Sequence, residues 1–221
     1  MKLFTLGLSS ASLAAASLFW LTSASSPAAT LPAGTVGSAA AAASAAVVED
    51  LQWGTFTVDT GHSAIGFKVM HMGVCWARGR FNDFTGEIVL KKDPSECEVM
   101  IEIESKSIDT ASENRDRHLR APDFFDAVAH PLIGFESTSV SSDGKGGYTL
   151  EGTLSLHGVT KDVEVDMALV GAKDLGARMG YRAGFEGEFT IDRTDFGMMY
   201  GADGSIGKEV TVSISLELSK K

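Results

Sequence analysis

Hydrophobic and polar residues alternate one by one along most of the chain after Trp53. Residues 63–71 are one example, because Ile65, Phe67 and Val69 all fall on one face of an extended segment. The same alternation recurs in residues 99–104, 148–156, 162–169, 181–191 and 209–218. A period of two is typical of β-strands with one face in a core and the other in water. The pattern therefore predicts antiparallel strands around a single interior.

Glycine-rich and polar turn sequences, such as residues 143–147 and 201–204, separate these runs. Residues 112–125 break the alternation, and their helix-forming side chains predict a short helical insertion. About eight strands with one short helix predict an all-β fold, a closed or nearly closed antiparallel barrel, because closing the sheet leaves no exposed edge. A sandwich of two sheets stays open on the pattern alone.

The first part of the chain has a different composition. Lys2 is the only charged residue before Glu49. An apolar stretch over residues 3–21 is followed by small residues at 22–24, the order found in a cleaved export signal. An uncleaved membrane anchor is the alternative. The predicted organisation is a signal peptide (1–24), a flexible alanine-rich tether (25–51) and a folded barrel domain (52–221).

The charge of the chain argues against a nucleic-acid partner. The net charge is −10 at pH 7, and an acidic surface repels phosphate backbones.

The 5 histidines lie in separate segments without the spacing of a zinc motif. Residues 201–209 depart from a phosphate-binding loop, because Ala202 and Glu209 replace the glycine and the hydroxyl residue that it requires. We therefore assign no catalytic residue, metal or cofactor, and expect no enzymatic activity.

Two features leave alternatives open. If Cys75 and Cys97 face one another, an oxidising compartment favours a disulfide between them. Gly152 and Gly187 fall on the inward faces of their strands. They either leave room for a ligand in the interior or relieve strain where the strands bend.

Several motifs occur in chain order and carry a family resemblance. They are Asp59–His71, Gly79–Gly86, Ser107–Thr110 with Asn114–Leu119 and Asp123–Asp126, Pro131–Phe135, Gly152–Lys161, and Ile191–Gly197 with Gly207–Val210. Together they resemble the YceI-like family of polyisoprenoid-binding periplasmic proteins. The resemblance covers residues 53–219. Residues 72–76 depart from it where the family varies, and neither cysteine belongs to the pattern.

The resemblance implies a lipocalin-like barrel that holds an isoprenoid or another long-chain lipid, as a periplasmic or secreted bacterial carrier or sequestering protein. The apolar strand faces supply the candidate walls of the binding cavity: Ile65, Phe67, Val69, Val99, Ile101, Leu150, Leu154, Val165, Phe185, Phe189 and Ile214. By motif position, the candidate polar residues near its mouth are His62, His71, Arg115, Asp116, His157, Arg193 and Asp195.

Two other classes of function stay open. An enzyme of isoprenoid or quinone metabolism would use Asp116, His118 or His157 as acid–base groups. A periplasmic stress protein would have a filled barrel and no ligand. The expected partner is a long-chain lipid and not a nucleic acid, and transient contact with a membrane and a homodimer are left open.

Overall fold

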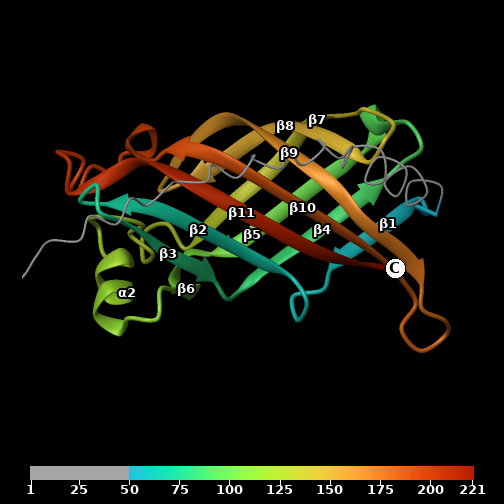
Figure 1. Ribbon diagram of the computed structural model, residues 1–221, viewed down its shortest axis with the longest axis horizontal. Helices are drawn as coiled ribbons and strands as arrows, with labels where there is room; N and C mark the ends of the chain where they lie inside the picture. The colour runs from blue at the N-terminus through green and yellow to red at the C-terminus, as the bar shows by residue number, and fades with distance from the viewer. Residues whose placement is uncertain (1–49) are drawn as a thin grey trace, which may run out of the picture. The chain divides into compact units, whose positions relative to one another are not determined.

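The computed structural model describes residues 50–221, and strands are the main element of this part of the chain (Figure 1). The predicted signal peptide and nearly all of the predicted tether lie outside the described residues. The strands are β1 (Gly54–Val58), β2 (Ala64–His71), β3 (Cys75–Phe81), β4 (Phe84–Leu90), β5 (Glu98–Glu104), β6 (Ile108–Asp109), β7 (Leu132–Ser142), β8 (Gly147–Leu156), β9 (Val159–Asp174), β10 (Tyr181–Asp192) and β11 (Ile206–Lys220). The helices are α2 (Glu113–Leu119) and the short 3₁₀ turns η1 (Pro94–Glu96), η2 (Ser105–Ser107) and η3 (Arg193–Phe196). Within residues 50–221, no helix combines the length and apolar composition that a bilayer span requires.

The sheet closes on itself. Neighbouring strands in the sheet follow the order β1-β4-β5-β7-β8-β9-β10-β11, and β11 also pairs with β1. This last pairing gives a closed antiparallel barrel of 8 strands. The predicted barrel is confirmed, and the sandwich is excluded. Closure pairs the edge strands, so the alternating apolar faces all point to one interior.

The other three strands continue this barrel. β1 pairs with residues 218–220 of β11, and β2 pairs with residues 206–215 of the same strand. The two strands therefore lie end to end along one edge of β11. In the same way β3 continues β4, because β3 pairs with β2 while β4 pairs with β1. The short β6 continues β5 beyond η2 and pairs with β3.

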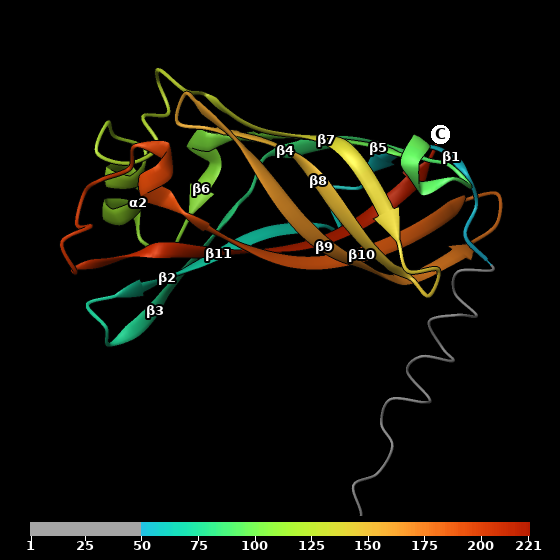
Figure 2. The same ribbon diagram turned by 90° about the horizontal axis from the view of Figure 1, so that it is seen from above.

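The barrel wall is interrupted beside α2. β5 pairs with β7, but β6 pairs only with β3 and does not reach β7. The chain between β6 and β7, residues 110–131, fills this part of the wall and contains α2. Figures 1 and 2 both place α2 at one end of the barrel, together with the β2–β3 turn and the β10–β11 connection.

The helix is shorter than residues 112–125. It begins after Ser112, which has an extended backbone, and ends at Leu119. Turns follow as far as residue 129. Pro122 lacks the backbone N–H that a further helical turn would need, and it disfavours the helical conformation in the residue before it.

Side chains fill the barrel at the end away from α2, which we call the packed end: Leu51, Phe56, Tyr148, Tyr181, Phe185 and Leu218. The rings of Phe56 and Tyr181 lie 6.1 Å apart in an edge-on arrangement, and those of Tyr148 and Phe185 lie 5.7 Å apart. The Tyr181 hydroxyl donates to the backbone oxygen of Asp50 at 2.6 Å. Since Leu51 is buried in this core, the packed domain begins before residue 52, where we placed its start.

The cysteines do not form the disulfide considered from the sequence. Cys75 is exposed and pairs across the β2–β3 turn with His71, whereas Cys97 is buried before β5. The Cys97 sulfur accepts a hydrogen bond from the backbone N–H of Lys91 at 3.2 Å. Burial raises the pKa of this thiol. Because β3 and β5 are not neighbours in the sheet, the two thiols have no common strand pairing that would bring them together.

Gly152 and Gly187 do not enlarge the interior. A Cβ atom at Gly152 would lie 2.5 Å from the backbone oxygen of Glu136 and 2.6 Å from the Phe135 ring. A Cβ atom at Gly187 would lie 2.5 Å from the backbone oxygen of Asp166. Neighbouring groups already occupy the space over both glycines, so the expectation of extra room there is wrong. The close approach of another strand requires glycine at these positions.

Candidate functional site

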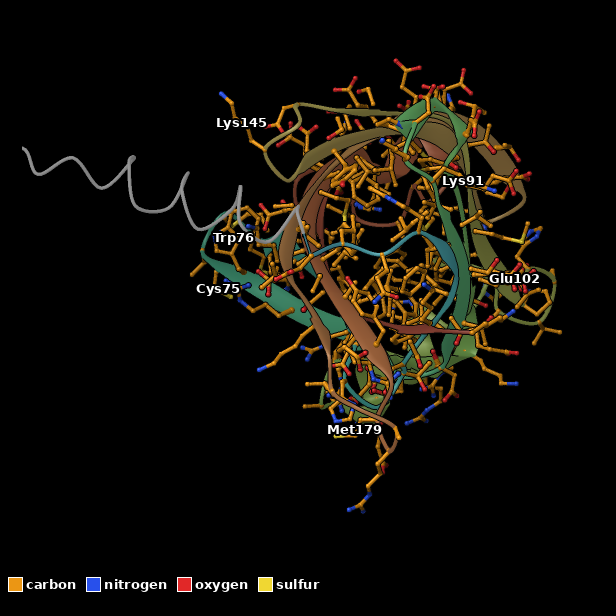
Figure 3. The ribbon with its side chains drawn as sticks, turned by 90° about the vertical axis from the view of Figure 1, so that its right-hand side faces the viewer. Cys75, Trp76, Lys91, Glu102, Lys145 and Met179 are labelled. Carbon is orange, nitrogen blue, oxygen red and sulfur yellow. The ribbon has the colours of Figure 1, made fainter. Side chains whose placement is uncertain are left out.

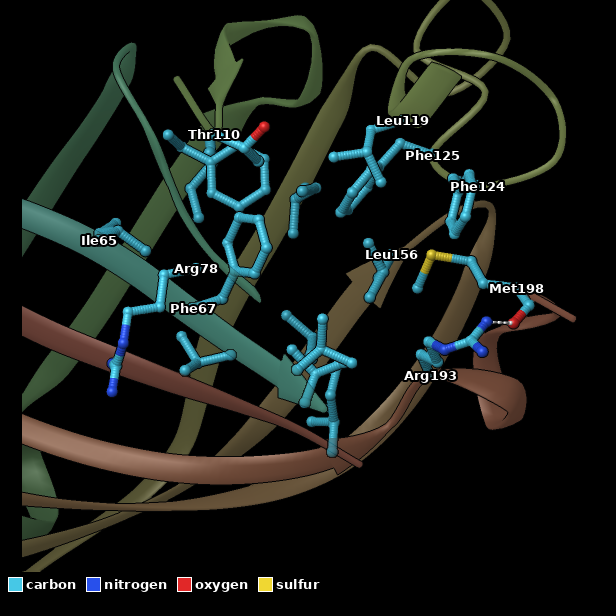
Figure 4. Close-up of a pocket in the computed structure, with 18 of the residues that line it drawn as sticks. Ile65, Phe67, Arg78, Thr110, Leu119, Phe124, Phe125, Leu156, Arg193 and Met198 are labelled. Carbon is cyan, nitrogen blue, oxygen red and sulfur yellow. Dashed lines mark hydrogen bonds between the residues drawn. The ribbon is translucent and has the colours of Figure 1, made fainter. Parts of the chain in front are cut away.

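A cavity of about 580 Å³ occupies the half of the barrel nearest α2 (Figure 4). Most of its walls are aliphatic and aromatic side chains. The structure places these predicted wall residues around it: Ile65, Phe67, Val69, Val99, Ile101, Leu150, Leu154, Val165, Phe189 and Ile214. Phe185 is the exception, because its ring packs against Tyr148 in the packed end. That wall assignment is wrong, since the alternation places Phe185 inside the barrel but not at the hollow end.

Exposed residues from three segments border the cavity and mark where it opens to solvent. We call this opening the mouth, and it is formed by His71, Arg78, Asn114, Arg115 and Tyr200. On one side, β6 pairs with β3 only at Arg80 and Phe81, so the rest of the β3 edge is free. The opposite side is formed by the segment that contains α2. The mouth therefore lies at the interruption in the barrel wall.

Apolar side chains from the α2 segment cover the cavity. Figure 4 shows Leu119, Phe124 and Phe125 reaching into it toward Leu156 and Met198. The ring of Phe125 meets that of Phe81 edge-on at 5.6 Å, which fixes the segment to β3. The α2 segment therefore acts as a cover over the place where the strands part.

An aromatic cluster connects this cover to the β10–β11 connection. The His118 ring lies 5.0 Å from Phe124 and 4.8 Å from Tyr200, and the Phe124 and Tyr200 rings are 5.2 Å apart. His118 Nε2 also lies 3.0 Å from a carboxylate oxygen of Asp123. All three cluster residues line the cavity, so the contacts that hold the cover also border the mouth.

Arg115 and Asp116 fix the chain just before α2. The buried Asp116 carboxylate accepts from the Thr110 backbone N–H at 2.9 Å and from the Thr110 hydroxyl. Arg115 donates through Nε to that hydroxyl at 2.7 Å and through Nη2 to the Thr110 backbone oxygen at 2.6 Å. Arg115 lines the cavity and Asp116 does not. Asp116 therefore positions the segment and does not border the mouth.

Arg193 is a buried cation at the cavity wall. It donates to the backbone oxygens of Gly207 at 2.8 Å and Ile206 at 3.0 Å. It also donates to the backbone oxygen of Met198 at 2.5 Å (Figure 4). Burial lowers the pKa of Arg193, and the nearby Asp192 charge acts in the opposite direction. None of the ion pairs within residues 50–221 involves this guanidinium. Its hydrogen bonds hold the β10–β11 connection against the start of β11.

Three of the predicted mouth residues, His71, Arg115 and Arg193, line the cavity, and the others do not. His62 lies beyond the opposite end of β2 from His71, with its Nδ1 3.3 Å from Asp59. His157 is bonded through Nδ1 to the backbone oxygen of Phe196 at 2.9 Å, and Asp195 is exposed beside it in η3. His62 and His157 contact turns and Asp195 is exposed away from the cavity, so their assignment to the mouth does not match the structure.

Polar groups outside the predicted set of mouth residues also border the cavity, and of these only His118 had been considered, as an acid–base group: Arg78, Thr110, Ser112, Asn114, His118 and Tyr200. Apart from Arg78, they lie outside regular strands, where a period of two carries no information. Arg78 belongs by register to the outer face of the β2–β3 hairpin, opposite Lys68. The motif segment Asn114–Leu119 was the available signal for the residues of α2.

One group of side chains in the described part of the chain could approach a metal ion, and it lies outside the cavity. Asp59, His62 and Glu217 offer ligand atoms close together. Arg182 lies 3.9 Å from Asp59 and 3.4 Å from Glu217, so a guanidinium already balances this charge. The hydrogen bond from His62 is the main cause that lowers the pKa of Asp59. We regard the group as an ion-pair network at the start of β2.

Residues 56–218 match the YceI-like domain. The chain belongs to the YceI-like family. A UPF0312 protein of Pseudomonas aeruginosa is 38% identical over 189 residues, which cover 85% of this chain and 96% of that protein. A UPF0312 protein of Pectobacterium carotovorum is 39% identical over 163 residues, which cover 73% and 83%. The family predicted from the motifs is confirmed.

Solved structures of YceI-like proteins share the barrel. A mutant of the YceI protein of Campylobacter jejuni, solved with a monobromobimane guest, has a TM-score of 0.61 at 26% identity and covers 74% of this chain and 96% of its own. A polyisoprenoid-binding domain from Saccharophagus degradans has a TM-score of 0.59 at 16% identity, covering 77% and 100%. At that identity the second likeness concerns the fold.

Proposed function

We propose that this protein binds one long-chain, mainly apolar lipid of the isoprenoid type in the barrel and carries or sequesters it. The observation that carries the proposal is the cavity of about 580 Å³, whose interior walls are apolar and whose mouth is polar. The chain of the lipid lies among the wall residues and its head lies at the mouth. A structural neighbour described as a polyisoprenoid-binding domain supports this choice of ligand class.

The energetics of an apolar cavity suit such a ligand. Ligand pockets in proteins typically enclose about 300–1,000 Å³. Each buried methylene contributes about 0.8 kcal/mol, so about ten buried carbons contribute roughly 8 kcal/mol before the entropy cost of association. Chain length therefore sets most of the affinity, and the few polar groups of the mouth favour one type of head group.

The contacts of the polar side chains at the site support a carrier function better than an enzymatic one. Two of the three candidate acid–base side chains, Asp116 and His157, do not line the cavity and have structural partners: Asp116 bonds to Thr110, and His157 bonds to the backbone oxygen of Phe196. His118 is at the mouth, but it is paired with Asp123 and packed against Tyr200. A predicted signal peptide adds export to the proposal, which places the carrier in the periplasm or outside the cell.

A pair of neighbouring substitutions on β11 tests the proposal. Ile214 lines the cavity, whereas Ser213 is exposed on the outer face of the same strand. We expect Ile214→Trp to occupy the cavity and to weaken binding of cis-parinaric acid, a fluorescent long-chain lipid, by about 10-fold or more. Ser213→Trp should bind the probe as the unchanged protein does.

Circular dichroism and thermal melting accompany the fluorescence titration, so that binding is compared between folded proteins. A folded Ile214→Trp protein that binds the probe as tightly as Ser213→Trp contradicts the proposed site. Val212→Trp, at a second wall position on the same strand, replaces Ile214→Trp if that variant does not fold.

A further inference from the structure

Exposed apolar side chains gather around the mouth. Met72 and Val74, in the β2–β3 turn, are 62% and 82% exposed. Met199 and Tyr200, in the β10–β11 connection, are 61% and 49% exposed, and Trp76 at the start of β3 is 48% exposed. We call these five residues the rim.

The two segments of the rim are joined. The backbone N–H of Met72 donates to the backbone oxygen of Ser205 at 3.0 Å, so the β2–β3 turn is fixed to the β10–β11 connection. Both segments lie at the α2 end of the barrel in the two views of Figures 1 and 2. Since Tyr200 lines the cavity, the rim is continuous with its opening.

The tip of the β2–β3 turn has an unusual residue for its backbone. Met72 and Gly73 have φ values of 53° and 68°, the left-handed conformation of a tight hairpin turn. Asn, Asp and Gly favour this conformation, whereas a long side chain adopts it rarely. The sequence nevertheless places methionine there and exposes it to solvent. This arrangement suits a side chain that contacts something outside the barrel.

The charge of this hairpin is opposite to that of the whole chain. The net charge of the protein is −10, yet residues 64–81 contain Lys68, Arg78 and Arg80 and no acidic residue. Lys68 and Arg78 are opposite one another in the register. Lys68 lies 5.8 Å from the centre of the Trp76 ring and 3.4 Å from Glu188, and Arg80 lies 3.8 Å from Asp109, so acids outside the hairpin partly balance these two charges. Within the described residues, Arg78 forms no hydrogen bond or ion pair, so its charge is available to an anionic surface.

We propose that the rim docks on a membrane surface that contains anionic lipids, so that ligand moves between the bilayer and the cavity without crossing water. A bilayer interface has an apolar acyl region beneath its anionic head groups. The exposed apolar side chains of the rim suit the acyl region, Trp and Tyr suit the boundary, and the basic residues suit the anionic head groups. The transferred ligand rests on the function proposed above, but the docking of the rim does not require it. A bilayer explains why the apolar rim surrounds the opening of an apolar cavity.

Vesicle flotation tests the docking with a matched control at the other end of the barrel. The rim variant is Met72→Asp with Val74→Asp, and Asp suits the left-handed backbone at residue 72. The control is Leu175→Asp with Met179→Asp, at residues 39% and 51% exposed in the β9–β10 connection. Figure 3 shows Met179 on that connection, separate from Cys75 and Trp76 on β3.

The vesicles contain phosphatidylethanolamine and phosphatidylglycerol, and the protein carries the amino terminus that its cells produce. We expect the rim variant to partition about 10-fold less than the unchanged protein, because two inserted apolar side chains are lost. The control variant should partition as the unchanged protein does. Arg78→Gln should lower partitioning about 5-fold on these vesicles and not on pure phosphatidylcholine.

Three outcomes overturn the docking: no flotation of the unchanged protein, equal flotation of the rim and control variants, or flotation only with vesicles that contain membrane proteins. Titration with cis-parinaric acid in the absence of vesicles separates this failure from that of the proposed function. If the rim variant binds the probe normally but does not float, docking and lipid binding are separate properties, as proposed.

Discussion

Phe185 and Phe189 lie on the same face of β10, four residues apart, and have different surroundings. Phe185 packs edge-on against Tyr148 in the packed end, whereas Phe189 borders the cavity. The same strands supply both ends. The difference comes from what closes each end of the barrel: at the packed end, Leu51 and the hydrogen bond between Tyr181 and Asp50 close the interior.

At the cavity end the barrel wall is incomplete. The α2 segment covers this interruption but does not fill the cavity beneath it. β6 ends after two residues and does not reach β7. The α2 segment crosses this interruption and contributes side chains to the cavity from outside the strands. An inward strand position therefore becomes core or cavity wall according to what the loops at that end place over it.

The largest expected effect is on stability at the packed end. Phe56 is fully buried, so Phe56→Ala should lower the free energy of unfolding by about 3–5 kcal/mol. Phe189→Ala should lower it by about 1 kcal/mol in the lipid-free protein, because Phe189 is only half-buried and borders the cavity. Urea unfolding of lipid-free protein measures both. Equal losses would mean that the two ends are packed alike.

Gly187 lies between these two phenylalanines on β10 and tests the boundary between the ends. Gly187→Ala should destabilise the protein by about 1–3 kcal/mol, because its Cβ would meet the backbone oxygen of Asp166. Gly171 in β9 is the matched control, since nothing lies within 4 Å of the position of its Cβ. Gly171→Ala should change stability by less than about 0.5 kcal/mol. If thermal melting shows the same loss of stability in both variants, contact with the neighbouring strand does not explain why glycine occupies position 187.

The smallest effects concern pH and differ between the ends. Hydrogen bonds from Thr194 lower the pKa of Asp192 at the cavity end, so the stability that this carboxylate contributes is present above pH 3.8 and is lost as the pH falls through its folded pKa. Burial raises the pKa of Tyr181 at the packed end, so its contribution is present below pH 10.0 and is lost as the pH rises.

Urea midpoints measured across pH test this pair. Asp192→Asn should flatten the acid side of the stability profile, and Tyr181→Phe should flatten the alkaline side. Profiles that keep their shape in both variants would show that other groups determine the pH dependence.

The alternation predicted the barrel and most of the cavity wall, because a period of two determines which side chains point inward. It could not place Phe185, since the period does not say how far along the barrel axis a loop or a neighbouring ring closes the interior. The mouth was the least predictable part. Thr110 and Tyr200 reach it from loops and His118 reaches it from α2, whereas His157 is bonded to the backbone of η3 and Asp195 is exposed there.

The disulfide considered from the sequence failed for a related reason. Whether two cysteines meet depends on which strands are neighbours. β3 lies between β2 and β6 in the sheet, whereas Cys97 is hydrogen-bonded to Lys91, directly after β4. Spacing along the chain carries no information on that pairing.

The central claim is that the cavity end holds one long-chain lipid. Native mass spectrometry of the protein as its cells produce it, followed by organic extraction of the same sample, tests this claim most directly. The account predicts a mass excess equal to one long-chain lipid per chain, which is recovered in the extract and is absent from the Ile214→Trp protein. A folded protein without any extractable lipid, or the same lipid content in Ile214→Trp, would contradict it.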